Sequence, residues 1–336
     1  PPRSTLFPYT TLFRSAAAAA GAHALKIQTY TADTMTLALD EGEFHVEHPL
    51  WGGQSLHTLY QQAYTPWEWH AAIFRRAREL GLIAFSTPFD ASAVDFLESL
   101  DVPAYKIASF ENADLPLIRK VAATGKPMIV STGMATLAEL DEMVTAARAA
   151  GCRDLILLKC TSTYPASPEN SHLRTIAHMR ELFAHTGGQL EVGLSDHTAG
   201  LGAAVAAVAL GATVIEKHFT LARAEGGVDA AFSLEPDELA ALVVETDRAW
   251  RALGQVRYGP TEAEAASRVF RRSLYIVCDL ERGERLTPDN LRAIRPGLGL
   301  PPKYYEQLLG RRLARAARRG TPVSWELFSD EDQDGQ

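Results

Sequence analysis

Short apolar runs that end in polar residues recur along this chain and alternate with segments of helical spacing. The runs occupy residues 24–30, 82–89, 104–109, 128–134, 155–164, 192–198 and 213–220. Continuous Val, Ile and Leu runs are typical of buried parallel strands. Strands that alternate with helices predict either an open doubly wound sheet or a (β/α)8 barrel. Because polar residues close nearly every run, and barrel enzymes take their active-site groups from many strand ends, the pattern favours the barrel.

The segments between the runs predict the helices. Residues 67–80 and 137–150 have helical spacing, and Gly81 and Gly151 follow them as C-terminal stop signals. The aromatic-rich segment 31–66 suits either a folded lid or packing against the barrel, and we favour packing.

A barrel of this kind has eight strands, and the pattern shows seven. The first strand would therefore precede Ala16. Residues 1–15 match nothing that follows and look like read-through of a sequencing adaptor translated at the broken end of an assembled gene. We expect a non-native segment at 1–15, a first strand that is lost or replaced, and a catalyst impaired by that truncation. An ordinary disordered N-terminus is the alternative.

The pattern changes after residue 253. Residues 16–253 form the predicted barrel, and the polar segment 254–272 is a predicted linker. Residues 273–328 are rich in turns and locally basic, and so few residues give only a marginal core of their own. We expect this small domain to dock on something larger. The acidic composition of residues 329–336 predicts a disordered tail.

Composition narrows the class of protein. The chain has 336 residues with 46% hydrophobic and 22% charged residues, which is ordinary for a soluble enzyme. A net charge of −8 argues against nucleic acid or an anionic membrane as partner. The three cysteines have no metal-ligand spacing and suggest no disulfide framework, which fits the cytoplasm. No apolar run approaches the length of a membrane span.

Two histidines follow neighbouring predicted strands. His197 and His218 stand at the ends of a predicted strand–helix–strand unit, whose parallel strands end on the same rim. Asp196, Glu216 and Lys217 crowd that rim in sequence. A single His is more often a hydrogen-bonded structural residue, but two at matching strand ends favour metal ligands. The set suits a divalent cation such as Mn²⁺, with Mg²⁺ or Co²⁺ as alternatives.

The other predicted strand ends carry lysines, hydroxyls and carboxylates. Lysines act on an oxyanion as point charges, and hydroxyls add neutral donors. Taken singly, these residues are commonly solvated or turn-forming, but together they predict a metal-assisted enzyme for a phosphorylated or carboxylated small molecule. The set consists of Lys26, Gln28, Thr29, Thr87, Lys106, Ser109, Glu111, Ser131, Thr132, Thr161, Tyr164, Ser195 and Glu216.

Motifs along residues 16–328 resemble the sialic acid synthase family. They are KIQTYTADTMTL, AYTPWEWH, FSTPFD, VPAYKIASFE, STGMAT, LLKCTSTYP, GLSDHT, VIEKHFTL, DAAFSLEP, RRSLYIV and IRPGLGLPPKY. The resemblance implies a (β/α)8 barrel and a C-terminal antifreeze-like (SAF) domain, which caps the barrel of a partner chain in a swapped homodimer. It also implies condensation of phosphoenolpyruvate with an N-acetylated amino-sugar aldehyde and water, with a divalent metal and release of phosphate.

The resemblance implies a role for each matching residue. His197 and His218 are the implied metal ligands, and Glu111 and Lys106 are the implied catalytic residues. The phosphoenolpyruvate cradle comprises Lys26, Thr87, Lys106, Ser109, Ser131 and Ser195. The sugar would be held by Gln28, Tyr164, Glu216 and Asp229, and by Arg295 from the neighbouring chain.

Departures from the family pattern favour its pseudaminic branch. The CTxxYP turn has Ser162 and Thr163 where sialic acid synthases usually carry Asn, and Asp229 is followed by Ala230 rather than His. The family's first strand, with its acidic residue and Asn-His turn, is absent. A synthase for N-acetylneuraminate or legionaminic acid remains the alternative enzyme. A truncated, non-catalytic carbohydrate-binding protein is the alternative of another class.

Overall fold

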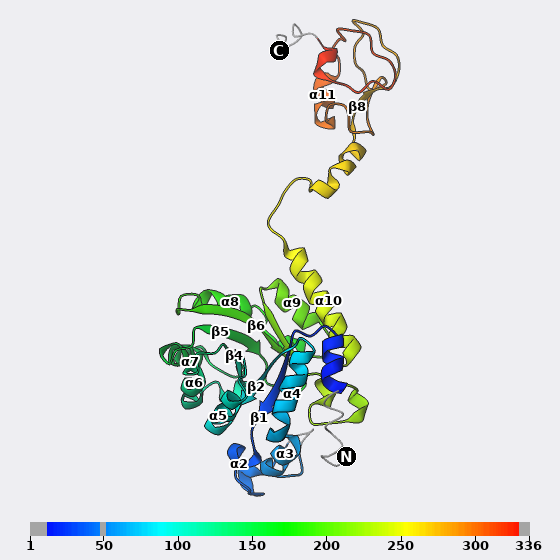
Figure 1. Ribbon diagram of the computed structural model, residues 1–336. Coiled ribbons are helices and arrows are strands. Elements are labelled where there is room, and N and C mark those ends of the chain that lie inside the picture. Colours follow the sequence, from blue (N-terminus) through cyan, green and yellow to red (C-terminus); the bar gives the residue numbers. More distant parts are fainter. Residues whose placement is uncertain (1–11, 48–51, 329–336) are drawn as a thin grey trace. The chain divides into compact units, whose positions relative to one another are not determined.

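The computed structural model describes residues 12–47 and 52–328 (Figure 1). The chain divides into two compact units, residues 1–254 and 255–336. Most of residues 1–15 and the predicted acidic tail lie outside the described residues.

Seven parallel strands form the sheet of the first unit, in the order β1-β2-β3-β4-β5-β6-β7. All seven apolar runs are strands, so this prediction is confirmed, and the curled sheet has the character of a (β/α)8 barrel. Within the described residues β1 and β7 are its two edges. The strands are β1 (Ala24–Thr29), β2 (Ile83–Pro88), β3 (Tyr105–Ile107), β4 (Met128–Ser131), β5 (Asp154–Cys160), β6 (Gln189–Asp196) and β7 (Val214–Lys217).

Helices connect the strands and cover the outer face of the sheet (Figure 1). Thr136 and Glu139 form a capping box at the start of α7, and Asp90 caps α5. Gly81 and Gly151 have positive φ just after α4 and α7, and these two helices match the predicted ranges to within a residue. The helices are α2 (Ala32–Met35), α3 (Leu56–Ala63), α4 (Trp67–Glu79), α5 (Ala91–Ser99), α6 (Leu115–Ala122), α7 (Leu137–Ala149), α8 (Thr175–Phe183), α9 (Gly202–Ala209) and α10 (Pro236–Leu253).

The main core lies between the strands and these helices. It includes Tyr105 and Ile107 of β3 and Met128 and Val130 of β4, all with none of their surface exposed. Burial of this apolar surface is the chief stabilising contribution, about 25 cal/mol per Å². A smaller cluster lies on the opposite face of the strands.

The N-terminal part of the first unit packs closely. Residues 12–19 are helical, and the ring of Phe13 lies 4.8 Å from that of Phe219. The helix thus begins inside the segment expected to be non-native. In the 31–66 insertion, Leu59 of α3 is buried and Tyr60 meets Tyr30 with ring centroids 5.8 Å apart. These contacts agree with the expected packing against the barrel.

The second unit has its own small core, which includes Leu274, Leu291, Leu308 and Val323. Strands β8 (Ser273–Ile276) and β9 (Leu291–Ile294) pair antiparallel, and α11 (Tyr305–Leu308) follows them. The predicted linker contains two short 3-10 helices, Glu262–Glu264 and Ala266–Phe270.

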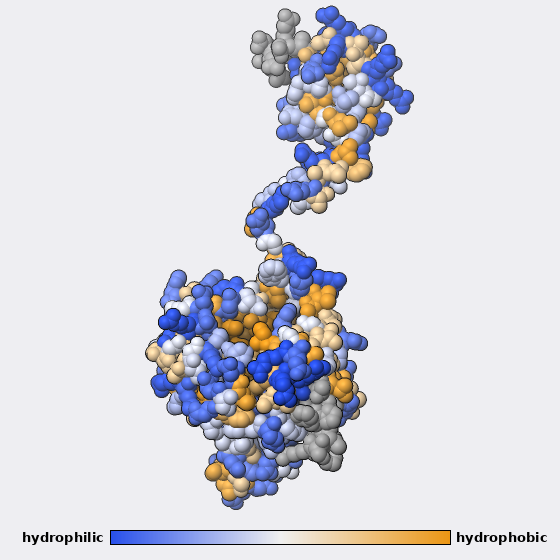
Figure 2. Space-filling view, viewed as in Figure 1, coloured by the Kyte–Doolittle hydropathy of each residue, from blue (hydrophilic) through white to orange (hydrophobic). Residues whose placement is uncertain are grey.

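Hydrophilic residues cover most of the visible face of each unit, with smaller hydrophobic areas between them (Figure 2). Within the described residues no helix is both long enough and apolar enough to cross a membrane.

Candidate active site

Alternation along the strands determines which side chains face the interior of the curled sheet, because successive residues point to opposite faces. Phe85, Ile129 and Val214 pack together on the interior face. Side chains an even number of residues further along each strand share that face, near the carboxyl ends. This set contains most of the predicted site residues, namely Lys26, Gln28, Thr87, Lys106, Ser131, Ser195, His197, Glu216 and His218.

The carboxylate of Glu216 joins three of these side chains. Its Oε1 lies 3.1 Å from Nζ of Lys26 and 3.7 Å from Nζ of Lys106, and it accepts a 3.2 Å hydrogen bond from Ser195 Oγ. Burial opposes the charge on Glu216, but the two ammonium groups prevail and lower its pKa to about 2. Burial lowers the pKa of Lys106 to about 8, against the attraction of Glu216. The two lysines therefore face the interior as a positively charged pair.

Two hydroxyl groups of the predicted phosphoenolpyruvate cradle accept hydrogen bonds from protein donors. Lys106 Nζ donates to Ser131 Oγ at 2.6 Å, and the N–H of Gly133 donates to Ser109 Oγ at 3.1 Å. A hydroxyl that accepts in this way still has its own proton to donate. Thr87 Oγ1 is buried and makes no hydrogen bond within the described residues. All three hydroxyls can therefore donate to a bound anion.

Glu111 lies on the 3-10 helix η2 (Ser109–Glu111), directly after β3. Burial raises the pKa of its carboxyl group to about 7, although the charge of Lys106 acts in the opposite direction. Its Oε2 is buried without a hydrogen-bond partner among the described residues. A carboxyl group that titrates near neutral pH can both give and take a proton, as acid–base catalysis requires.

The structure brings the two predicted metal ligands together, with the ring centroids of His197 and His218 5.3 Å apart. Nδ1 of His197 lies 3.0 Å from the carbonyl oxygen of Thr161, which can only accept, so Nδ1 carries the proton in this bond. Nδ1 of His218 lies 3.4 Å from Oδ2 of Asp229. Metal-binding histidines commonly donate their second ring N–H to a carbonyl or carboxylate in this way.

Both imidazoles can thus present Nε2 to a cation. Within residues 12–47 and 52–328 no group of three or more His, Cys, Asp or Glu could hold a metal ion. Two imidazole ligands leave most coordination positions to water and substrate, which suits a borderline divalent cation. The residues present fit such an ion.

Aromatic rings enclose the histidine pair. The ring of Tyr164 lies 4.4 Å from that of His197, and the ring of Phe232 lies 4.9 Å from that of His218. Tyr164 and Phe232 are themselves 5.3 Å apart. Leu234, two residues after Phe232, donates its N–H to the carbonyl oxygen of His218 at 2.8 Å. This bond ties the loop that carries Asp229 and Phe232 to the end of β7.

Family comparison agrees with this geometry. A model of the NeuB family matches residues 14–258, and a model of the SAF domain matches residues 271–329. The first match alone spans more than half of the chain. The chain belongs to the NeuB family.

Three similar proteins illustrate the relationship. The pseudaminic acid synthase of Campylobacter jejuni is 44% identical over 91% of this chain and 88% of its own length. That of Helicobacter pylori is 42% identical over 90% of this chain and 88% of its own. The crystal structure of an N-acetylneuraminic acid synthetase from Leptospira borgpetersenii, in complex with citrate, is 28% identical and matches with a TM-score of 0.68, covering 78% of this chain and 85% of that one.

Two residues expected at the rim of this NeuB family site end β6 and β7, but their side chains point away from the barrel interior. Asp196 and Lys217 alternate with the interior residues Ser195 and Glu216, so they point to the outer face of the strands. There they form a buried ion pair, with Lys217 Nζ 2.9 Å from Asp196 Oδ2. The expectation that they crowd the active-site rim is wrong, because the two-residue period of a strand turns them away.

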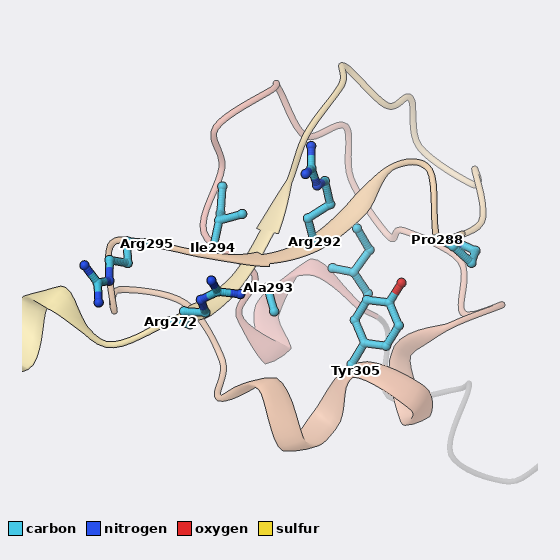
Figure 3. A pocket seen from close by; sticks show the side chains of 8 residues that line it. Arg272, Pro288, Arg292, Ala293, Ile294, Arg295 and Tyr305 are labelled. Atoms are coloured by element: carbon cyan, nitrogen blue, oxygen red, sulfur yellow. The ribbon is translucent and has the colours of Figure 1, made fainter.

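Arg295 lies on the second unit and not among the interior residues of the NeuB barrel. It lines a groove of about 860 Å³ together with Arg272, Arg292 and Tyr305. Figure 3 shows Arg295 and Arg272 at one end of this groove and Tyr305 toward the other.

Sequence reasoning missed a buried polar network behind the NeuB site. Thr29 Oγ1 lies 2.8 Å from Nε2 of His70 and 2.6 Å from Oγ of Ser86, and all three side chains are on the outer face of β1 and β2. Thr29 and Ser86 adjoin the interior residues Gln28 and Thr87, so Thr29, which was expected among the strand-end groups of the site, faces away from the interior. Strand alternation alone could have assigned Thr29 and Ser86 to the outer face, but the contribution of His70 from α4 requires the folded structure.

Proposed function

We propose that this chain condenses phosphoenolpyruvate with 2,4-diacetamido-2,4,6-trideoxy-L-altrose and water, giving pseudaminic acid and phosphate. The observation that carries the proposal is the similarity to two pseudaminic acid synthases over about nine tenths of the chain. The chemistry of the interior side chains supports it, since lysines and hydroxyls that suit an anion adjoin a histidine pair that suits a divalent cation.

The anionic end of the site would hold phosphoenolpyruvate. Lys26 and Lys106 would neutralise its phosphate and carboxylate, and the hydroxyls of Thr87, Ser109, Ser131 and Ser195 would donate hydrogen bonds to their oxygens. Glu216 Oε1 already contacts both lysines, so a bound anion shares these lysines with it. Its other oxygen is left to accept from a sugar hydroxyl, beside Gln28, Tyr164 and Asp229.

The reaction makes a carbon–carbon bond and a carbon–oxygen bond to water, and it breaks the carbon–oxygen bond to phosphate. C3 of phosphoenolpyruvate attacks the aldehyde carbon, and the aldehyde oxygen takes up a proton as the bond forms. Water adds to C2, and phosphate then leaves with its bridging oxygen. Glu111 is the proposed proton donor and acceptor, because its carboxyl group titrates near neutral pH beside Lys106.

His197 and His218 would hold a divalent cation, for which we propose Mn²⁺, with Mg²⁺ and Co²⁺ as alternatives. When bound, such an ion polarises a carbonyl oxygen. The hydrogen bond from His197 Nδ1 to Thr161 and the approach of Asp229 to His218 support this role, because they orient Nε2 of each ring.

We further propose that residues 16–253 are the catalytic domain, 254–272 a linker and 273–328 the SAF domain of a swapped homodimer in the cytoplasm. Arg295 would then reach the sugar bound by the partner chain. The groove on the second unit supports a ligand-facing role for Arg295, because Arg272 and Arg292 add positive charge beside it.

The direct test is incubation with phosphoenolpyruvate, Mn²⁺ and one N-acetylated sugar at a time, with phosphate release and the product mass measured. We expect turnover with the trideoxy-altrose substrate, its loss with EDTA, and recovery on adding Mn²⁺. Faster turnover with N-acetylmannosamine would favour the rival N-acetylneuraminate synthase. Faster turnover with the diacetamido sugar that leads to legionaminic acid would favour the second rival, a legionaminic acid synthase. No phosphate release with any sugar would favour a non-catalytic carbohydrate-binding protein.

A further inference from the structure

A buried amide connects two neighbouring strand-end loops. Asn112 follows η2 and has only 5% of its surface exposed. Its Nδ2 lies 3.2 Å from the carbonyl oxygen of Ser131 and 3.2 Å from that of Gly133. A carboxamide nitrogen has two hydrogens, so Asn112 can give one to each carbonyl. Ser131 ends β4, and Gly133 lies in the turn that follows it.

The same two loops are joined by bonds that involve the proposed anion cradle itself. Gly133 donates its N–H to Ser109 Oγ, three residues before Asn112, and Lys106 donates to Ser131 Oγ. Asn112 therefore bonds the backbone of the two residues, Ser131 and Gly133, whose other groups contact the cradle.

The turn after β4 is closely packed and has an uncommon backbone conformation. A Cβ built on Gly133 would lie 2.1 Å from Ser162 Oγ and 2.7 Å from Ser109 Oγ. The next residue, Met134, has a φ of 65°, a conformation that side-chain-bearing residues seldom adopt. Two bonds from one rigid amide help to hold this uncommon backbone in place.

We propose that Asn112 is a positioning residue that sets the spacing between the Ser109 and Ser131 hydroxyls for the anionic groups of phosphoenolpyruvate. The inference rests on the proposed function, because it takes those hydroxyls as donors to that substrate. Asn112 itself touches no reacting atom in this arrangement. Removing its side chain should therefore lower the affinity for phosphoenolpyruvate, because the Ser109 and Ser131 hydroxyls remain but their spacing is no longer fixed.

The test compares Asn112→Ala and Asn112→Asp in the full chain. Alanine removes both donors, and an ionised aspartate faces two carbonyl oxygens with a charge and no donor. Each variant should raise KM for phosphoenolpyruvate about tenfold or more, which corresponds to about 1.4 kcal/mol. The KM for the sugar should change less than about threefold, since neither bond involves a residue proposed to hold the sugar. Calorimetric titration with phosphoenolpyruvate alone should give the same loss of affinity.

Asn290 provides a matched control from the second unit. It is also buried, with 8% exposed, and its side chain accepts from the N–H of Thr287 at 2.7 Å and donates to the carbonyl of Arg285 at 3.0 Å. Asn290→Ala should lower thermal stability and leave phosphoenolpyruvate affinity unchanged. If Asn112→Ala behaves like Asn290→Ala, with lower stability and unaltered affinity, Asn112 is only structural and the inference is wrong.

Ser131→Ala separates failure of the inference from failure of the proposed function. Loss of phosphoenolpyruvate affinity in Ser131→Ala with normal affinity in both Asn112 variants would overturn the positioning role and leave the cradle intact. Normal affinity in Ser131→Ala and in Lys106→Met would overturn the cradle, and the proposed function with it.

Discussion

At the residue scale, two glutamates at or just after the end of a strand have pKa values shifted in opposite directions by their surroundings. Glu216 contacts Lys26 and Lys106 and has a pKa lowered to about 2, whereas burial raises the pKa of Glu111 to about 7. A permanently charged group and a group that exchanges protons near neutral pH can thus act side by side.

Glu111→Gln should lower activity and raise stability at alkaline pH. Because burial raises the pKa of Glu111, its contribution to stability is fully present below its ordinary value of 4.5 and is lost as pH rises through about 7. The neutral glutamine avoids that loss, so Tm of the ligand-free variant should exceed that of the parent at pH 8 and equal it at pH 4.5. Turnover should fall by about 10²–10⁴ if Glu111 moves protons. Equal Tm differences at the two pH values would contradict the raised pKa.

Much of the site at this scale follows from sequence, because polar residues at the ends of apolar runs and the two-residue strand period identify Lys26, Thr87, Lys106, Ser195 and Glu216. Contacts between segments that are far apart in the sequence cannot be predicted in this way. The sequence gives no signal that Asn112 bonds the turn after β4, or that one carboxylate of β7 lies between lysines of β1 and β3. These depend on the curvature of the sheet and on rotamers.

At the element scale, the ends of β6 and β7 are held together on the outer face while they carry histidines on the inner face. Asp196 and Lys217 are almost fully buried, and Lys217 Nζ also donates to the carbonyl oxygen of Thr198 at 2.6 Å. The pair flanks His197 and His218 in sequence. Its role is structural support for the histidine-bearing ends.

Removing one partner of this buried pair should destabilise the first unit strongly. Lys217→Met leaves the Asp196 carboxylate buried without its cation, and such changes typically cost about 3–5 kcal/mol. The double variant Asp196→Asn, Lys217→Met should recover part of the loss, because no unpaired charge remains. Urea unfolding measures both. Glu245→Gln, which breaks the exposed pair with Arg248, should change stability by less than about 0.5 kcal/mol. A similarly small effect of Lys217→Met would mean that water reaches the pair.

The loop after β7 should contribute to sugar selection. Phe232 is buried and packs on His218 and Tyr164, and the neighbouring Ala230 is also buried and apolar. Such a wall suits a C6 methyl group, whereas a C6 hydroxyl placed there would lose hydrogen bonds to water, which costs about 1–3 kcal/mol. Phe232→Ser should therefore reduce the preference for the trideoxy sugar over N-acetylmannosamine by about tenfold or more. The ratio of kcat/KM for the two sugars is the measurement, and an unchanged ratio would exclude this wall from selection.

At the scale of the whole molecule, the order of strands and helices was predictable because parallel strands with covered faces leave a continuous apolar signal. The division into two units was also visible, since composition and periodicity change near residue 253. Whether Arg295 of the second unit serves a barrel is not encoded in any local pattern. Only the resemblance to the NeuB family suggested that the arginine acts on a neighbouring chain.

Complementation between two impaired variants can decide whether Arg295 acts on the barrel of its own chain or on that of a partner. His218→Ala should disable the barrel of its own chain, and Arg295→Ala should lower kcat/KM for the sugar by about 10- to 100-fold through the loss of a charged hydrogen bond. In a swapped dimer of the two variants, one site combines an intact barrel with an intact arginine from the partner. Random co-assembly should then restore about a quarter of wild-type activity. Co-expression with two different affinity tags yields the mixed dimer for assay. If Arg295 served the barrel of its own chain, the mixed dimer would contain no intact site, and its activity would not exceed that of the Arg295→Ala protein.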